Sequence, residues 1–288
     1  MEKRAFVFPF FHISCSCLFT IFLFATSASG SLVFNFYAAS CPIAELIVRD
    51  TVSSSSSSDP SIPGKLLRLV FHDCFVEGCD ASLTLQGNNT EQSDPANRSV
   101  GGFSVIESAK RVLEFLCPGA VSCADIIALA ARDAVEIVGG PMIQIPTGRR
   151  DGMVSIASNV RPNILDTSFT MDEMINRFSN KGLSLFDLVI LSECPTSASP
   201  SVQVNNDPET SMVFDNQYYR NLLTNKGLFQ SDSALLSDNR TRKLVEDLAN
   251  DQEFFFESWG QSFLKLTSVG VKTGDEGEIR RSCASTNA

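Results

Sequence analysis

Apolar residues recur at three- and four-residue spacing in seven stretches of the chain, which predicts a protein built mainly of helices. No alternating run of comparable length predicts a strand. Cys117-Pro118-Gly119 and Gly139-Gly140-Pro141 end two of the stretches, and Ser184 with Asp187 suits the start of a further helix. We therefore expect an all-α fold, with helices within Ile43–Val52, Gly64–Phe75, Phe103–Leu116, Val121–Val138, Thr170–Lys181, Phe214–Thr224 and Arg240–Leu266.

Two segments interrupt this pattern, the serine run Ser53–Ser58 and the stretch Glu193–Glu209. A serine run suits a flexible linker, but Asp59-Pro60 begins the next unit at once, so we interpret it as a short surface connection between two helices. Ser, Pro, Thr and Asn dominate Glu193–Glu209, which predicts no clear element there. The sequence thus predicts one domain over residues 31–288.

The first thirty residues have the pattern of a secretory signal peptide. Lys3 and Arg4 precede an apolar run over Ala5–Ala25, and small residues follow up to Gly30. A membrane anchor is the alternative, because the run approaches the roughly twenty residues of a spanning helix. Pro9 and the small-residue end favour a leader that is cleaved, and no later segment is long and apolar enough to span.

Composition and charge limit the kinds of molecule that the protein can bind. The 288 residues are 43% hydrophobic, which fits a protein with a substantial core and excludes general disorder. The net charge of −10 repels nucleic acid and anionic membranes, so neither is expected as a partner. We expect a monomer.

Cysteine usage agrees with an oxidising compartment. Seven cysteines follow the leader, and an odd number leaves one thiol without an intramolecular partner. Three Asn-X-Ser/Thr sequons, at Asn88, Asn97 and Asn239, are compatible with secretion. The seven cysteines are Cys41, Cys74, Cys79, Cys117, Cys123, Cys194 and Cys283.

Arg68 and His72 are the first candidates for chemistry. They lie four residues apart in a strongly apolar helix, so both side chains project from one face. An imidazole can move a proton between the two oxygens of hydrogen peroxide, while a fixed guanidinium stabilises the charge that develops as the O–O bond breaks. The alternative is a core histidine with an arginine that reaches the surface.

The loop after His72 is rich in oxygen ligands. Cys74 and Cys79 with a histidine suggest zinc, but a secreted chain favours a disulfide and the spacing offers no fourth ligand. Asp73, Asp80 and Ser82 could bind calcium with backbone carbonyls, and a solvated acidic turn is the alternative.

Six strings resemble the signatures of class III plant secretory haem peroxidases, in the family's order, and the resemblance covers nearly everything after the leader. It implies an all-α haem-peroxidase fold with helices around a haem cavity, haem b and two calcium ions as cofactors, and hydrogen peroxide with small phenolic donors as substrates. The strings are LLRLVFHDCFVEGCDAS (66–82), VSCADIIALAARDAV (121–135), PTGRRDG (146–152), FDNQYYRNLL (214–223), KGLFQSD (226–232) and GEIRRSC (277–283).

The resemblance also assigns roles to individual residues. Arg68 and His72 match the distal arginine and acid–base histidine, and Phe71 matches the aromatic residue against the haem. Glu91 and Asn97 resemble the relay to the distal imidazole, although the spacing after Asn97 is one residue shorter than in the family. The resemblance implies distal calcium ligands Asp73, Val76, Gly78, Asp80 and Ser82, and disulfides Cys41–Cys117, Cys74–Cys79 and Cys123–Cys283, with Cys194 left unpaired.

One departure from the family affects the iron itself. Relatives continue the helix corresponding to Leu183–Ser192 into a Gly-Ala-His-Thr string whose histidine binds the haem iron. Here Ser192 is followed at once by Glu193-Cys194-Pro195, so a segment is missing between Ser192 and Glu193 and the proximal side is incomplete. Only His12, in the leader, and His72 are present in the chain.

The missing segment changes what the proximal residues can do. Asp232 matches the carboxylate that would hydrogen-bond the lost imidazole, and we expect it to have no partner. Cys194 and Met212 are the alternative iron ligands. The proximal calcium site should be weaker, because one contributor is lost from a set that otherwise retains Asp207, Thr210, Val213 and Asp215.

Two functions follow. The first is a secreted haem peroxidase that removes hydrogen peroxide and oxidises cell-wall phenolics, including lignin precursors, outside the cell or in the vacuole. The second is a catalytically impaired splice or gene-model variant that cannot ligate haem iron. Loss of one cavity wall would expose apolar surface and favour retention in the secretory pathway.

Overall fold

Ten α-helices are the main regular elements in the part of the chain that the structure, a computed structural model, describes: residues 31–192, 197–199, 202–204 and 209–287. The all-α prediction is confirmed. The helices are α1 (Ala44–Ser58), α2 (Ile62–Val76), α3 (Phe103–Leu116), α4 (Cys123–Ile137), α5 (Met171–Asn180), α6 (Leu185–Leu191), α7 (Gln217–Leu223), α8 (Gln230–Ser237), α9 (Arg242–Asn250) and α10 (Gln252–Leu266).

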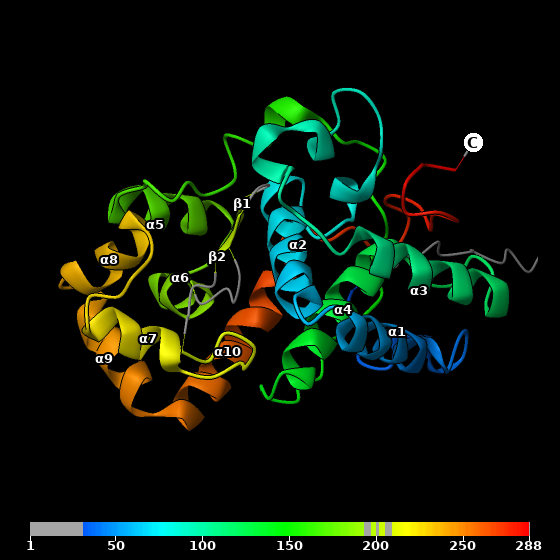
Figure 1. The fold of residues 1–288 in the computed structure, drawn as a ribbon. Helices are drawn as coiled ribbons and strands as arrows, with labels where there is room; N and C mark the ends of the chain where they lie inside the picture. The colour runs from blue at the N-terminus through cyan, green and yellow to red at the C-terminus, as the bar shows by residue number, and fades with distance from the viewer. Residues whose placement is uncertain (1–30, 193–196, 200–201, 205–208, 288) are drawn as a thin grey trace, which may run out of the picture.

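The helices form two groups, with α10 passing between them (Figure 1). In the first group α1 and α2 pack on α4, and α3 packs on α1. Every residue of α4 from Cys123 to Val135 is buried, which explains its apolar character on all sides. The second group contains α5 to α9, and α10 packs on α6 and α9.

Three local predictions were wrong, and one helix, α8, was missed. The serine run belongs to α1, where the Ser57 and Ser58 hydroxyls donate to the carbonyls of Ser53 and Ser54 one turn back. The stretch Arg240–Leu266 is two helices, because Asp251 is extended and its side chain accepts from Phe254 N–H to start α10. Within Glu193–Glu209, β1 (Ser197–Ser199) and β2 (Val202–Val204) pair antiparallel.

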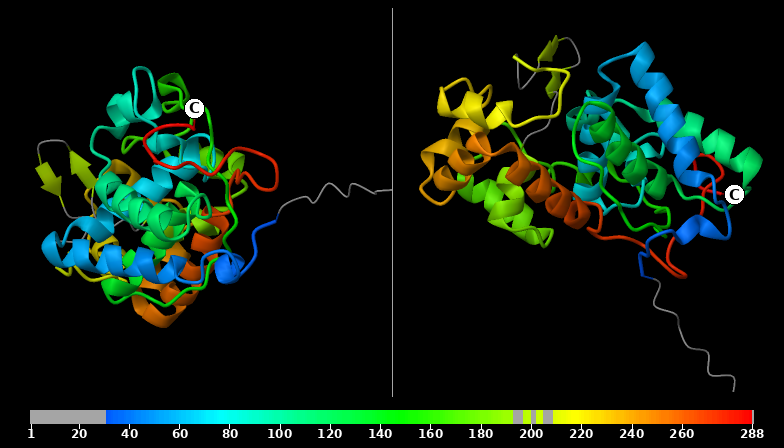
Figure 2. Two further views of the ribbon diagram at one scale, coloured as in Figure 1. Left: turned by 90° about the vertical axis from the view of Figure 1, so that its right-hand side faces the viewer. Right: turned by 90° about the horizontal axis from the view of Figure 1, so that it is seen from below.

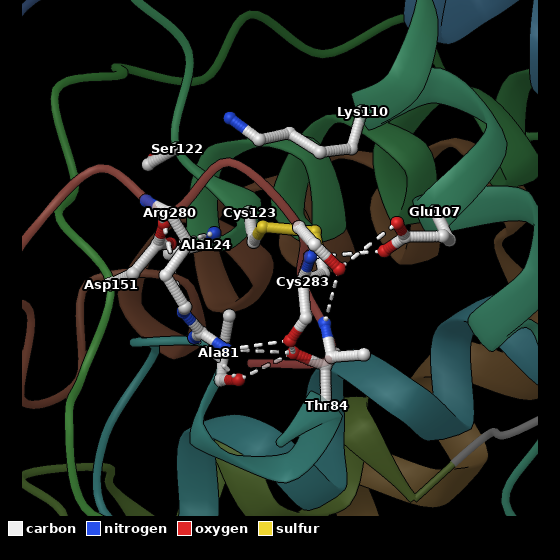
Figure 3. The surroundings of a disulfide bond; sticks show 12 residues. Ala81, Thr84, Glu107, Lys110, Ser122, Cys123, Ala124, Asp151, Arg280 and Cys283 are labelled. Atoms are coloured by element: carbon white, nitrogen blue, oxygen red, sulfur yellow. Dashed lines mark hydrogen bonds and ion pairs between the residues drawn. A yellow bond between two sulfur atoms is a disulfide. The ribbon is translucent and has the colours of Figure 1, made fainter. Parts of the chain in front are cut away.

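The C-terminal segment returns to the first helix group, as two further views show (Figure 2). The Cys123–Cys283 disulfide ties it to α4 (Figure 3). Around this disulfide, Cys283 N–H donates to Glu107, while the Cys283 carbonyl accepts from Thr84 and Arg280. The segment is thereby fixed beneath the loop that follows α2.

A contact between two glycines fixes the same loop from the other side. Gly78 has φ +101°, and a Cβ atom there would lie 2.3 Å from the Gly270 carbonyl oxygen. Only glycine meets both demands, and the adjacent Cys79 N–H donates to the Val269 carbonyl. The predicted leader, residues 1–30, lies outside the described residues, and no helix in the described part is long and apolar enough to cross a membrane.

Candidate active site

A cavity of about 490 Å³ lies between α2 and the second helix group. Most of its wall is apolar, and Arg68 and His72 face it from α2. From the other side it is lined by the end of α6, the start of α8 and the middle of α10, with Trp259. The further lining residues used below are Phe71, Arg161, Met174, Ser192 and Asp232.

The position of α2 explains why these side chains reach the cavity. The helix has a proline in its first turn, and its remaining faces are buried against α4 and the core. Arg68, Phe71 and His72 occupy the face that is left. Phe71 also packs on Phe75, with ring centroids 4.1 Å apart, so that the aromatic wall continues into the core.

His72 is held by Asn97, which ends the short 3₁₀ helix Pro95–Asn97. His72 Nδ1 lies 2.6 Å from Asn97 Oδ1, and Asn97 Nδ2 donates to the Glu91 carbonyl at 2.8 Å. Because a carbonyl can only accept, this orients the amide with its oxygen toward the imidazole. Nδ1 therefore carries the proton, and Nε2 is left with a lone pair.

Burial keeps this imidazole neutral. His72 is 4% exposed, and the pKa of its imidazole is lowered to about 3, first by burial and then by the nearby Arg68 charge. The hydrogen bond that the imidazole donates to Asn97 opposes this shift but does not overcome it. At neutral pH the side chain is thus a base ready to accept a proton.

The loop after α2 carries buried oxygen atoms that could hold calcium. Asp73 is buried and accepts from the Ala81 and Leu83 N–H groups, and burial followed by the Asp80 charge raises its pKa to about 8. Ser82 Oγ and both carboxyl oxygens of Glu91 are buried, and apart from the interaction between these two side chains they have no hydrogen-bond partner among the described residues. A cation bound by oxygen ligands would satisfy these groups, so the residues fit calcium.

Two cations already contact this loop. The Lys272 ammonium pairs with Asp80 Oδ2, and the Arg280 guanidinium donates to the Asp80 carbonyl. It also donates to the Ala81 carbonyl (Figure 3). Val76 and Gly78 lie on the same turn, where only their carbonyls are suited to a metal. No group of three or more His, Cys, Asp or Glu side chains suited to a metal occurs among the described residues.

The opposite wall corrects one expectation. Asp232 was expected to have no partner, but Tyr218 Oη donates to its Oδ1 at 2.9 Å, and the Leu228 and Phe229 N–H groups donate to its Oδ2. Burial nevertheless raises the pKa of this carboxyl. Tyr218 is thus a partner of Asp232 in the described structure.

This wall supplies no histidine, cysteine or tyrosine among the described lining residues. It ends at Ser192, and Cys194 lies outside the described residues. Met212 is 50% exposed and does not line the cavity, which makes it unsuitable as an iron ligand. Met174 does line the cavity but was not singled out from the sequence.

The predicted proximal calcium residues are only partly described. Thr210 Oγ1 donates to Asp215 Oδ1 at 3.1 Å, and Val213 N–H donates to the Thr210 carbonyl. Asp207 lies outside the described residues. The structure thus brings Thr210, Val213 and Asp215 into one turn before α7.

The structure contains the three disulfides that the resemblance implied, Cys41–Cys117, Cys74–Cys79 and Cys123–Cys283. The contacts of three residues were not predicted from the sequence: Tyr218 with Asp232, Lys272 with Asp80, and Arg161 with the cavity. Tyr218 lies within a quoted family string, but a string does not reveal which side chains it contacts. Arg161 lines the cavity with its Nε 3.4 Å from Asp94, and its type alone gave no signal.

The fold and the site together define a class, a helical protein with an apolar cavity beneath an arginine and a neutral histidine. A model of the peroxidase family matches residues 48–196 and 192–251. Peroxidase 46 of Arabidopsis thaliana is 56% identical over 322 residues, covering 96% of this chain and 99% of that protein. Peroxidase 18 of the same plant is 57% identical over 310 residues, covering 93% and 94%. The chain belongs to the peroxidase family.

Proposed function

We propose that this chain is a secreted haem peroxidase that reduces hydrogen peroxide at the cavity and oxidises phenolic donors. One observation carries the proposal. Arg68 and a neutral His72, its tautomer fixed by Asn97, face a largely apolar cavity. The close identity to proteins named peroxidases supports it.

The residues act on peroxide through one proton. His72 Nε2 takes the proton from one peroxide oxygen and delivers it to the other oxygen, which leaves as water. Arg68 stabilises the negative charge that develops on the departing oxygen. Haem b, when bound here, supplies the electrons for this cleavage, and phenolic donors restore them one at a time. Phe71 and Trp259 line the cavity and would pack on the haem, and the largely apolar lining fits such a group.

Calcium is the second proposed cofactor. The carboxylates of Asp73 and Asp80, the Ser82 hydroxyl and the carbonyls of Val76 and Gly78 would hold it beside α2. Because Asp73 directly follows His72, this ion would fix the helix end that carries the catalytic base. The second site, which includes Asp215, lacks the contributor from the missing segment.

We also propose that a family segment is absent between Ser192 and Glu193. The two matched regions of the family model meet at residues 192–196, and the alignment to Peroxidase 46 is longer than this 288-residue chain. The predicted leader directs the domain, residues 31–288, to the cell exterior, the cell wall or the vacuole. The relatives lend no support to the alternative, an inactive variant.

Peroxidase assays on matched chains test this proposal. The secreted chain is loaded with haemin and calcium, and guaiacol oxidation is compared with that of a chain in which the corresponding Peroxidase 46 segment joins Ser192 to Glu193. We expect peroxide-dependent activity above free haemin, reduced about 100-fold or more by His72→Ala in both chains. Activity confined to the restored chain would support the inactive alternative.

A further inference from the structure

The three sequons of the chain differ sharply in accessibility. Asn88 and Asn239 are exposed and lie in turns. Asn97 is 1% exposed, and it is the residue that holds His72. One sequon, Asn97-Arg98-Ser99, therefore coincides with a residue of the candidate active site.

Both ends of the Asn97 amide are occupied in the folded chain. Its nitrogen Nδ2, the atom that N-glycosylation modifies, donates to the Glu91 carbonyl at 2.8 Å, and its Oδ1 faces His72 at 2.6 Å. Glu91 is itself fully buried and its N–H donates to Ser155 Oγ. No room remains beside Nδ2 for a sugar.

We infer that glycosylation at Asn97 and assembly of the distal site exclude one another, so that this sequon acts as a branch point in folding. The transfer replaces one N–H bond of Nδ2 with a bond to the first sugar carbon of a lipid diphosphate oligosaccharide. The bond from that carbon to the diphosphate oxygen breaks, and the amide proton leaves with the diphosphate. No oxidation or reduction occurs.

In the newly made chain, glycosylation of Asn97 competes with the folding step that buries its side chain. His72 and Asn97 are 25 residues apart, and the turns between them close through local hydrogen bonds, including Asn97 N–H to the Asp94 carbonyl. A chain that closes these turns first buries Nδ2. A chain modified first cannot place Asn97 beside His72, and it leaves buried polar groups unpaired.

This inference rests on the proposed function, because only a chain that enters the secretory pathway is glycosylated. The variant that tests it is Ser99→Ala. The change destroys the sequon but retains the Asn97 amide. Asn239→Gln, which removes an exposed sequon, is the matched control. Glycopeptide mass spectrometry measures occupancy at each site in the secreted and the retained chain from plant cells.

We expect Asn97 to be unmodified in secreted chain and modified in part of the retained chain. Ser99→Ala should raise the secreted yield about twofold or more, because the diverted fraction is recovered, and Asn239→Gln should not. A secreted chain glycosylated at Asn97, an unmodified Asn97 in both fractions, or an unchanged yield for Ser99→Ala would overturn the inference.

A parallel arm separates this result from secretion itself. There, a host leader replaces residues 1–30, so that the chain enters the lumen whatever its own leader does. Glycans at Asn88 or Asn239 report entry independently of Asn97. Glycans at Asn88 and Asn239 that are present with the host leader but absent with the native leader would contradict the secretory proposal. The inference about Asn97 is then tested in the arm with the host leader.

Discussion

At the scale of single residues, the hydrogen-bond partners of the polar side chains decide what the cavity can do. Asn97 determines which nitrogen of His72 is a base, and Tyr218 determines how Asp232 is held. Both contacts use groups that are almost fully buried. Removal of either partner leaves a largely buried polar group without its hydrogen bond.

Tyr218→Phe tests the contact on the proximal side. Loss of the hydroxyl leaves Asp232 Oδ1 without its donor, so we expect the free energy of unfolding to fall by about 1–3 kcal/mol. Urea unfolding measures it. Tyr219→Phe is the control, since that hydroxyl donates to the carbonyls of Val189 and Ile190 instead.

The same substitution has a different expected effect in the chain with the restored segment. There an imidazole can donate to Asp232, so the loss caused by Tyr218→Phe should be smaller than in the present chain. Equal losses in the two chains would mean that Tyr218 and the imidazole do not share this carboxylate.

Residue identity predicted some of these positions but not their contacts. Arg68 and His72 could be found because residues four apart lie on the same face of a helix, and because the family string around them is long. The resemblance pointed to Asn97 despite a one-residue difference in spacing, but its contact with His72 depends on the turns that end at Asn97 and could not be derived from the sequence. The Asp232 partner could not be predicted, because Tyr218 comes from a different helix.

At the scale of elements, side chains at the start of α2 stabilise the helix that carries Arg68 and His72. Asp59 accepts from Ser61 N–H and Oγ through one oxygen and from the Lys65 ammonium through the other. These bonds, first that from Lys65, lower the pKa of Asp59 to about 2. Because its folded pKa lies below the unfolded value of 3.8, Asp59 stabilises the fold above about pH 4, and the contribution is lost as pH falls toward 2.

Asp59→Ala should therefore destabilise the chain at neutral pH more than at pH 3. Since the Asp59 side chain is 45% exposed, we expect only about 0.5–1 kcal/mol at pH 7. Urea unfolding at the two pH values measures the difference. Lys65→Met should reproduce part of the effect, and a loss that does not change with pH would contradict this account.

Element boundaries were the weaker part of the sequence prediction. The serine run was interpreted as a connection because serine favours turns, yet the buried Val48 and Val52 keep α1 packed on α4 and carry the helix through. Asp251 broke a periodic stretch because its side chain caps α10. In both cases tertiary packing or a single cap outweighed the pattern.

At the scale of the whole molecule, disulfides and the loop after α2 connect distant segments. Cys123–Cys283 holds the C-terminal segment against α4, and Arg280 from that segment supports the loop after α2 (Figure 3). The overall helical class was predictable, because amphipathic periodicity is local. The contacts of the proximal wall were not, since they join side chains of different helices, as in the Tyr218–Asp232 hydrogen bond.

Calcium should stabilise the whole molecule through this loop. At a calcium concentration 100 times the dissociation constant, a single site adds about 2.7 kcal/mol to the free energy of unfolding. Chelation with EDTA should therefore lower the melting temperature, and calcium, unlike magnesium, should restore it. Ser82→Ala should reduce this response, and a response unchanged by Ser82→Ala would contradict the assigned site.

The most direct test of the account is a titration of the calcium-loaded chain with haemin, followed by the Soret band and by the fluorescence of Trp259. This is the only tryptophan in the sequence, and it lines the cavity. The account predicts saturation at one haemin per chain, with quenching of Trp259 and a Soret band distinct from that of free haemin. Quenching that never saturates, or a spectrum identical to that of free haemin, would contradict it.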